Sequence, residues 1–287
     1  MFAALAASFT ALFPLAACAS VSEEECISGS PQSEDSSLRL SEERLGQPSI
    51  DTSASDEAES ASGVGETEDG SLPPEPVAVS YISVSADGVN IRSGAGVGYS
   101  VRGSADRNSV YALCDTVGDW YRTGYLNGDG YISRKYCTVV DMPTSGDERI
   151  EAVIAEGTKL LGTPYVYGAV RLHDGGGRLN KSFTADKFDC SSLMQYIFYK
   201  GAGELLDVNT RTQIFQGVTV SKAELRRGDL MFFTNDSRKN NSGTERVGHV
   251  ALYLGGNYIL HTASDYARIE EISPKRWSYF IQGQRIL

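Results

Sequence analysis

Phe188-Asp189-Cys190-Ser191-Ser192-Leu193-Met194 is the stretch that decides the fold of the second half of the chain, because a polar turn leads directly into an apolar run. Asp189 is a good N-cap residue, and residues 191–200 are apolar enough to bury one face of a helix, which Gly201 would stop. Cys190 would then lie where the helix dipole and free backbone amides favour the nucleophilic thiolate. The same thiol could equally be a small buried core residue, as free cysteines usually are.

The histidines favour the interpretation of Cys190 as a nucleophile over a buried core residue. The chain has only three, and two of them lie in neighbouring strand-like runs: His249 in 247–254 and His261 in 258–262. A tight turn between the runs would place residue 249 opposite 261 or 262, and cross-strand neighbours lie about 5 Å apart. His261 could then orient the imidazole of His249. A nucleophile, a base and an orienting group are what nucleophilic catalysis requires.

A zinc site is the alternative use of these three side chains, Cys190, His249 and His261. The sequence has no closely spaced pair of Cys or His ligands of the kind that marks such sites. We therefore expect no metal.

The N-terminal residues predict export. Residues 1–17 are apolar and small, which suits a signal peptide but is too short for a permanent membrane helix. Leu15-Ala16-Ala17-Cys18 resembles the lipobox of bacterial lipoproteins, which implies that Cys18 is lipidated after cleavage. The expected location is therefore extracytoplasmic, with residues 1–18 as signal and anchor.

Residues 19–76 are dominated by Ser, Glu, Asp, Gly and Pro, which predicts a disordered acidic tether. Most of the net charge of −11 falls in this segment. No basic surface of the kind that binds nucleic acid is left elsewhere, so no nucleic-acid partner is expected.

Residues 77–140 contain short alternating runs between turn signals, which predict a small β-barrel. The stretches 87–103 (DGVNIRSGAGVGYSVRG) and 118–137 (GDWYRTGYLNGDGYISRKYC) resemble a bacterial SH3 (SH3b) domain. The resemblance implies a module that binds cell wall or shapes a neighbouring site. We expect Trp120 and Tyr131 to belong to the barrel core.

Five cysteines are present: Cys18, Cys26, Cys114, Cys137 and Cys190. An oxidising compartment permits disulfides, and any nucleophile must remain free. Cys114 and Cys137 share the β-rich segment and could pair, although their spacing does not require it.

The last part of the chain follows a linker at 141–148. Residues 148–161 have apolar side chains at helical spacing and are followed by Gly162 and Pro164, so a helix is expected there. Strand-like runs come later, including 229–234. Helices first and strands afterwards predict an α+β domain with an antiparallel sheet.

The segment 149–287 resembles the NlpC/P60 family of papain-like cysteine peptidases. Five stretches carry the resemblance in order: Leu161–Gly168, Phe188–Ser191, Arg227–Phe233, Gly248–Gly255 and the strand that ends at His261. The resemblance implies that Cys190 attacks, His249 is the base, His261 orients it and Tyr165 lies beside the oxyanion site. The implied reaction is hydrolysis of the γ-D-glutamyl–diamino acid bond in peptidoglycan stem peptides, without a cofactor.

The order of an SH3b domain before the catalytic domain looks like the subgroup that trims peptides with a free N-terminal L-Ala. In that subgroup Asp189 and Ser191 would bind substrate. Two rival interpretations stay open. One is an amidase or acyltransferase that uses the same catalytic residues, and the other is a non-catalytic wall-binding lipoprotein.

Two departures from the family pattern bear on specificity. The family often has Arg-Thr-Ser where this chain has Arg211-Thr212-Gln213, so Gln213 replaces a cleft-lining Ser. Arg211 could contact a substrate carboxylate or form a structural ion pair. The link 171–187 is longer than usual and could cap the cleft, and His173 within it is expected to be solvated. Asp229 is expected to be structural.

Overall fold

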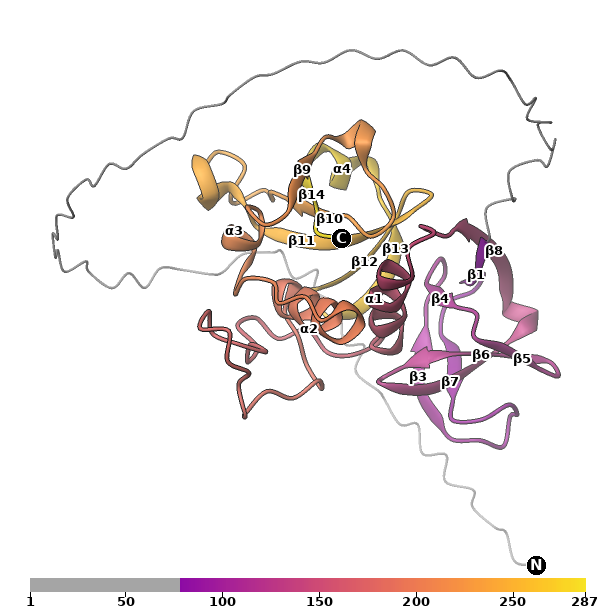
Figure 1. Cartoon of the computed structure of the whole chain (residues 1–287). Coiled ribbons are helices and arrows are strands. Elements are labelled where there is room, and N and C mark those ends of the chain that lie inside the picture. The colour runs from indigo at the N-terminus through magenta and orange to yellow at the C-terminus, as the bar shows by residue number, and fades with distance from the viewer. Residues whose placement is uncertain (1–77) are drawn as a thin grey trace, which may run out of the picture. The chain divides into compact units, whose positions relative to one another are not determined.

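The computed structural model describes residues 78–287 (Figure 1). The predicted signal peptide 1–18 with Cys18, and the predicted tether 19–76 with Cys26, lie outside the described residues. Within the described part, no helix is long and apolar enough to cross a membrane.

The first described segment consists of eight strands and one short 3-10 helix. They are β1 (Ala78–Val84), β2 (Val89–Arg92), β3 (Val101–Ala105), β4 (Val110–Ala112), β5 (Asp115–Val117), β6 (Trp120–Tyr125), β7 (Gly128–Ser133), η1 (Arg134–Tyr136) and β8 (Cys137–Pro143). Five of the strands form an antiparallel sheet in the order β3-β2-β7-β6-β5. Cys114 and Cys137 are free thiols.

The apolar centre of this segment differs from the expected one. Ile91, Tyr121 and Ile132 are buried, whereas Trp120 and Tyr131 are only half-buried. The placement of Trp120 and Tyr131 in the core was therefore wrong. Successive side chains of a strand point to opposite faces, and Tyr121 and Ile132, which are paired across β6 and β7, occupy the inner face.

The second segment contains four helices, two 3-10 helices and six strands. They are α1 (Glu148–Lys159), α2 (Cys190–Ala202), α3 (Thr210–Gln213), β9 (Val218–Val220), η2 (Lys222–Glu224), β10 (Leu230–Phe233), η3 (Gly243–Arg246), β11 (His249–Gly255), β12 (Tyr258–Ala263), β13 (Tyr266–Glu271), α4 (Pro274–Ser278) and β14 (Phe280–Arg285). Helices precede an antiparallel sheet, so the predicted α+β class is confirmed.

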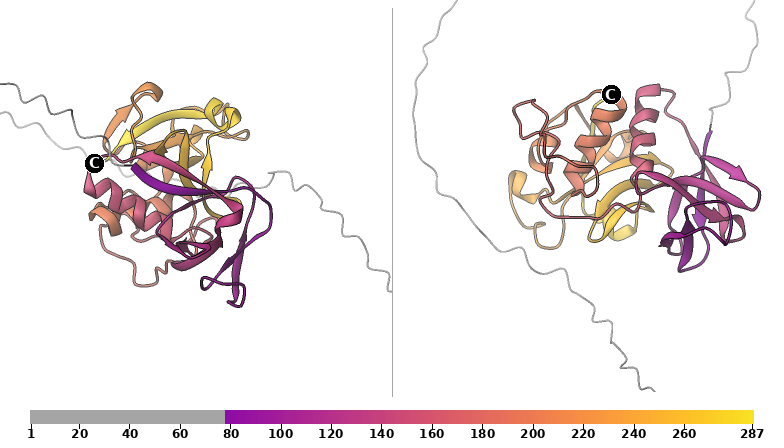
Figure 2. Two further views of the ribbon diagram at one scale, coloured as in Figure 1. Left: turned by 90° about the vertical axis from the view of Figure 1, so that its right-hand side faces the viewer. Right: turned by 90° about the horizontal axis from the view of Figure 1, so that it is seen from below.

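Helices α1 and α2 lie side by side on one face of the sheet (Figure 1, Figure 2). Gly201, the expected end of α2, lies inside the helix, and the helix ends at Gly203, whose φ of +74° is the left-handed conformation that glycine adopts readily. Gly201 has a different use. A Cβ there would lie 2.4 Å from the backbone nitrogen of Val153, so glycine is what lets α1 and α2 approach.

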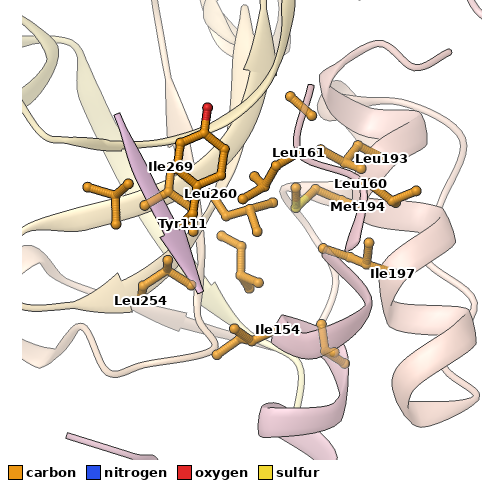
Figure 3. Close-up of a cluster of buried hydrophobic side chains, with 14 of the residues drawn as sticks. Tyr111, Ile154, Leu160, Leu161, Leu193, Met194, Ile197, Leu254, Leu260 and Ile269 are labelled. Carbon is orange, nitrogen blue, oxygen red and sulfur yellow. The ribbon is translucent and has the colours of Figure 1, made fainter. Parts of the chain in front are cut away.

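The larger of two apolar clusters lies between the two helices and the sheet (Figure 3). Helix α1 contributes Ile154, α2 contributes Leu193 and Ile197, and β12 contributes Leu260, all at most 2% exposed. Tyr111 of β4 enters the same core, so the β-rich segment contributes to the packing that holds α2 in place.

The two segments share further contacts. The larger sheet has the order β8-β1-β4-β13-β12-β11-β10-β14-β9, and β4 joins β13 at Val110 and Ile269. Arg227 bonds Glu151 at 2.8 Å, the Leu254 carbonyl at 2.7 Å and the Tyr81 hydroxyl at 3.0 Å. This buried guanidinium therefore ties α1 and β11 to β1.

Candidate active site

Cys190 is the first residue of α2, and its entry into the helix is fixed by a reciprocal capping box. The Asp189 carboxylate accepts the Ser192 backbone N–H at 2.9 Å, and the Ser192 hydroxyl accepts the Asp189 N–H at 2.9 Å. The N–H groups of Cys190 and Ser191 lie in the first turn, where helical amides have no intrahelical partner. They are donors for an anion that forms beside the sulfur.

The Cys190 thiol does not have the lowered pKa that its helix position predicts. Burial raises its pKa to about 12, and the charge of Asp189 raises it further, against opposing hydrogen bonds from the backbones of Val250 and Ser191 and the charge of Arg171. The expectation of a thiolate was therefore wrong for the free protein. The helix dipole is a smaller effect than desolvation of a residue that is only 9% exposed.

His249 on β11 and His261 on β12 are joined by a hydrogen bond of 3.0 Å between Nε2 and Nδ1. The predicted register, with residue 249 opposite 261 or 262, was wrong by one or two residues. Leu252 pairs with Leu260, and continuing this register places Ala263 opposite His249. The two histidines are diagonal neighbours instead, and they still share a face because side chains alternate with a period of two.

Glu270 on β13 extends this pair, and no sequence pattern singled it out. Its Oε1 lies 3.2 Å from Nε2 of His261, and Arg276 at the start of α4 contacts the same oxygen at 2.9 Å. The His261 contact is oblique, since the ring N–H does not aim along the line to the oxygen. Burial disfavours the charged carboxylate, but His261, Arg276 and Arg268 together lower the pKa of Glu270 to about 2.

The protonation pattern of the two rings follows from this carboxylate. An ionised Glu270 can only accept, so Nε2 of His261 carries the hydrogen and Nδ1 is its acceptor nitrogen. Nε2 of His249 must then donate to His261, which leaves Nδ1 of His249 with the free lone pair. Burial, together with the charges of His261 and Arg276, lowers the pKa of His249 well below 6.5, so this ring is a neutral base.

Nε2 of His249 and Nδ1 of His261 are bonded to each other, so neither is free to hold a metal ion. This favours a hydrogen-bonded series of Glu270, His261 and His249 (the relay) over a zinc site. Among residues 78–287, no group of three or more His, Cys, Asp or Glu is placed to hold a metal ion.

Asp189 and Ser191, the expected substrate-binding residues, are both buried and bonded to each other. The Ser191 hydroxyl donates to Oδ1 of Asp189 at 3.2 Å, and the Arg171 guanidinium contacts the same oxygen. Gly168 donates its N–H to Oδ2 at 3.3 Å. Asp189 is therefore surrounded by donors of its own chain.

The remaining predicted residues are placed around this centre. Tyr165 is half-buried and pairs with Phe188 through an isolated bridge, which sets it beside the segment that enters Cys190. Arg211 contacts Glu245 at 3.1 Å, the ion-pair alternative for this residue. Gln213 does not line a cleft, because it is fully buried and donates to the carbonyls of Ser191 and Asp207.

The expectation that His173 is solvated was wrong. The ring is 4% exposed, its Nε2 lies 2.7 Å from the Leu206 carbonyl, and its Nδ1 accepts the Gly175 N–H at 3.1 Å. Farther along, Phe183 stacks on Tyr196 with ring centroids 5.5 Å apart. The long 171–187 segment is therefore anchored at two points. A sequence pattern could not show this, because both partners lie on distant parts of the chain.

Asp229 has the structural role expected of it. It is 2% exposed, caps the Arg226 N–H at 2.7 Å and receives two bonds from Arg285, at 2.9 and 2.8 Å.

Comparison with known proteins identifies the segment that carries this centre. Residues 162–285 match the NlpC/P60 family. The chain is 32% identical to the peptidoglycan DL-endopeptidase CwlO of Bacillus licheniformis, over 53% of this chain and 30% of the relative. It is 31% identical to the gamma-D-glutamyl-L-lysine dipeptidyl-peptidase of Bacillus cereus, over 55% of this chain and 42% of the relative.

The chain thus spans less than half the length of these curated relatives. A solved NlpC/P60 family protein from Bacillus cereus is 22% identical and covers 73% of this chain and 64% of its own, with a TM-score of 0.39. The five sequence stretches that pointed to the family end at His261, whereas the matched range continues through β13 and β14. Residues 162–285 of this chain therefore form an NlpC/P60 family domain.

Proposed function

We propose that this protein is a cysteine endopeptidase that hydrolyses the γ-D-glutamyl–diamino acid bond of peptidoglycan stem peptides. The observation that carries the proposal is the arrangement of Cys190 at the start of α2 with the bonded pair His249–His261 inside an NlpC/P60 domain. The names of the relatives support the substrate class, since they include a peptidoglycan DL-endopeptidase and a gamma-DL-glutamyl hydrolase.

The mechanism begins from a neutral thiol and a neutral imidazole. When substrate displaces water from the site, Nδ1 of His249 takes the Cys190 proton as the sulfur attacks the γ-carbonyl carbon. The N–H groups at the start of α2 stabilise the resulting oxyanion. The imidazolium returns its proton to the departing amine, which leaves a thioester on Cys190. Water, deprotonated by His249, then releases the γ-carboxylate and restores the thiol.

The relay formed by Glu270 and His261 stabilises the positively charged form of His249 in this mechanism. Glu270 and His261 fix the tautomer that presents Nδ1 as the base, and the negative charge of Glu270 lies on the side where positive charge develops.

The test is incubation of the full chain with a defined stem peptide that contains L-Ala, γ-D-Glu and a diamino acid, followed by mass spectrometry. Cleavage between γ-D-Glu and the diamino acid is expected, and Cys190→Ala should abolish it while circular dichroism stays unchanged. Activity retained by this variant would rule out the assignment. Release of the whole stem peptide from muramic acid would indicate an amidase, and transfer to an added amine would indicate an acyltransferase.

The raised thiol pKa favours one rival, a non-catalytic wall-binding lipoprotein. Binding of the stem peptide with no turnover by wild type at any pH from 6 to 10 would support that rival.

We further propose that residues 77–140 act as an SH3b module that binds wall or shapes the site, and that a lipid on Cys18 anchors the protein outside the cytoplasm. The strands of 78–143 and the lipobox-like Leu15–Cys18 support these assignments. Partition of the full chain into detergent, lost in Cys18→Ser, would test the anchor. Substitution of Trp120 would test the module. The variant should no longer sediment with purified cell wall.

A further inference from the structure

The Asp189 carboxylate is the charged group nearest in sequence to the nucleophile, and it is bonded by four donors of its own chain. Its side chain is 5% exposed, and the donors are the Ser192 N–H, the Ser191 hydroxyl, the Gly168 N–H and the Arg171 guanidinium. Three of these donors bond Oδ1 and one bonds Oδ2, and the positive charge of Arg171 balances the charge of the carboxylate. A cationic group of a substrate therefore finds Asp189 already neutralised.

Arg171 comes from the long 171–187 segment and is held in place by its surroundings. Its side chain is 21% exposed, so it lies at the edge of the buried centre. Two residues farther on, the buried His173 is bonded to the Leu206 carbonyl at 2.7 Å. The anchor limits how far the Arg171 backbone can move from Asp189.

We propose that Arg171 is a specificity-determining residue that prevents the site from selecting a free N-terminal amine. Without Arg171, the buried carboxylate beside Cys190 would attract the ammonium group of a peptide that ends in free L-Ala. With Arg171 in place, the enzyme accepts stem peptides whose N-terminal nitrogen is in an amide bond, as it is in stem peptides still joined to the glycan strand. The inference rests on the proposed function and corrects the role that the family resemblance gives to Asp189.

Arg171 also has N–H donors that its contact with Asp189 does not use. A guanidinium carries five N–H donors, and Asp189 takes one of them through Nη1. Within residues 78–287 this guanidinium makes no other hydrogen bond, so its remaining donors can bond the carbonyl oxygen of a blocked N-terminus. A blocked peptide therefore gains a partner that an ammonium group cannot use.

The experiment compares two stem peptides that differ only in a free or an acetylated L-Ala amine. Binding is measured by calorimetry in the Cys190→Ala background, and kcat/KM is measured with active enzyme. With Arg171 present, the free peptide should bind no better than the acetylated one. In Arg171→Gln, preference should shift toward the free amine by about tenfold or more, and Arg171→Lys should keep the original ratio because it restores the positive charge.

Arg178→Gln, an exposed arginine of the same segment, is the matched control and should leave the ratio unchanged. A tenfold preference for the free amine in wild type, an unchanged ratio in Arg171→Gln, or no binding of either peptide would each overturn the proposal. Melting curves identify a variant that fails to fold, and the ratio in Arg171→Lys then decides. Binding with the expected ratios but no hydrolysis would instead contradict the proposed function alone.

Discussion

His249 and His261 are bonded through Nε2 and Nδ1 at 3.0 Å, with ring planes 81° apart. This edge-on arrangement lets each ring use one nitrogen for the other and keep one for a further partner. His261 uses its second nitrogen toward Glu270, and Nδ1 of His249 is the nitrogen that takes the thiol proton in the proposed mechanism. The charge of Glu270 therefore favours the tautomer in which Nδ1 of His249 is the basic nitrogen, although Glu270 acts on His249 only through His261.

Glu270→Gln should lower kcat about 10- to 100-fold with little change in KM, the range typical of groups that orient a reacting residue through an intervening side chain. A glutamine amide can donate as well as accept, so it no longer fixes the His261 tautomer. Stem-peptide hydrolysis followed by chromatography measures both constants.

The neighbouring Glu271→Gln is the control for this change. Glu271 is exposed and contacts Asn257 at 3.1 Å, so its neutralisation should leave kcat within about twofold of wild type. Equal effects of the two variants would mean that Glu270 acts only through the overall negative charge of the domain and not through its contact with His261.

Alkylation of Cys190 by iodoacetamide should be slow at pH 6–8 and should rise about tenfold per pH unit across and above this range, because a thiol pKa of about 12 leaves little thiolate at neutral pH. Peptide mass mapping at several pH values separates Cys190 from the other thiols. A rate that is already constant between pH 6 and 7 would mean that the thiolate forms in the free protein.

The pH profile of kcat/KM should lack an acid limb near 6.5. The pKa of His249 is lowered by burial and by the charges of His261 and Arg276, so the ring gains its proton only at clearly lower pH. Its neutral form is the one required, and activity should therefore persist as pH falls from 7 to about 5.5. For the same reason the unfolded chain binds this proton first, so stability is lost as pH falls below 6.5. A half-maximal rate at pH 6.5 would contradict the burial of His249.

Local sequence patterns predicted the parts of the site that local structure positions. Asp189 indicated the start of a helix, and the turn after the strand of His249 indicated a hairpin that places two histidines on one face. Glu270 and Arg171 could not be predicted in this way. Glu270 reaches His261 only because β13 pairs with β12 in a particular register, and Arg171 reaches Asp189 only because its segment is anchored at His173. Both placements depend on tertiary packing.

The pKa of the Cys190 thiol also depends on tertiary packing that the sequence does not show. The helix position of Cys190 favours thiolate, and a sequence shows the helix position. Desolvation opposes the thiolate and is the larger effect, and a sequence does not show how completely tertiary packing buries the sulfur.

His173→Ala should make the 171–187 segment easier to cleave. The Leu206 carbonyl keeps its bond from Gln195 but loses the one from His173, and the exposed Gly175 N–H loses its acceptor; each lost hydrogen bond costs about 0.5–1.5 kcal/mol. Trypsin cleavage at exposed Arg178 should become about tenfold faster, since cleavage follows the free energy of local opening. Asp174→Asn, a change at the exposed next residue, should cleave like wild type, and resistance of both variants would mean that Phe183 alone holds the segment.

Gly124→Ala tests whether the β-rich segment and α1 are packed against each other in solution. A Cβ at Gly124 of β6 would lie 2.7 Å from the Thr158 carbonyl oxygen and 2.8 Å from Cα of Lys159, at the end of α1. Backbone atoms cannot yield as a flexible side chain does, so the free energy of unfolding in urea should fall by about 1–3 kcal/mol. Gly98→Ala meets nothing within 4 Å and should stay within about 0.5 kcal/mol of wild type. If Gly124→Ala unfolded at the wild-type midpoint, β6 and α1 would have to separate readily, and the support that Tyr111 gives to the core beneath α2 would not be permanent.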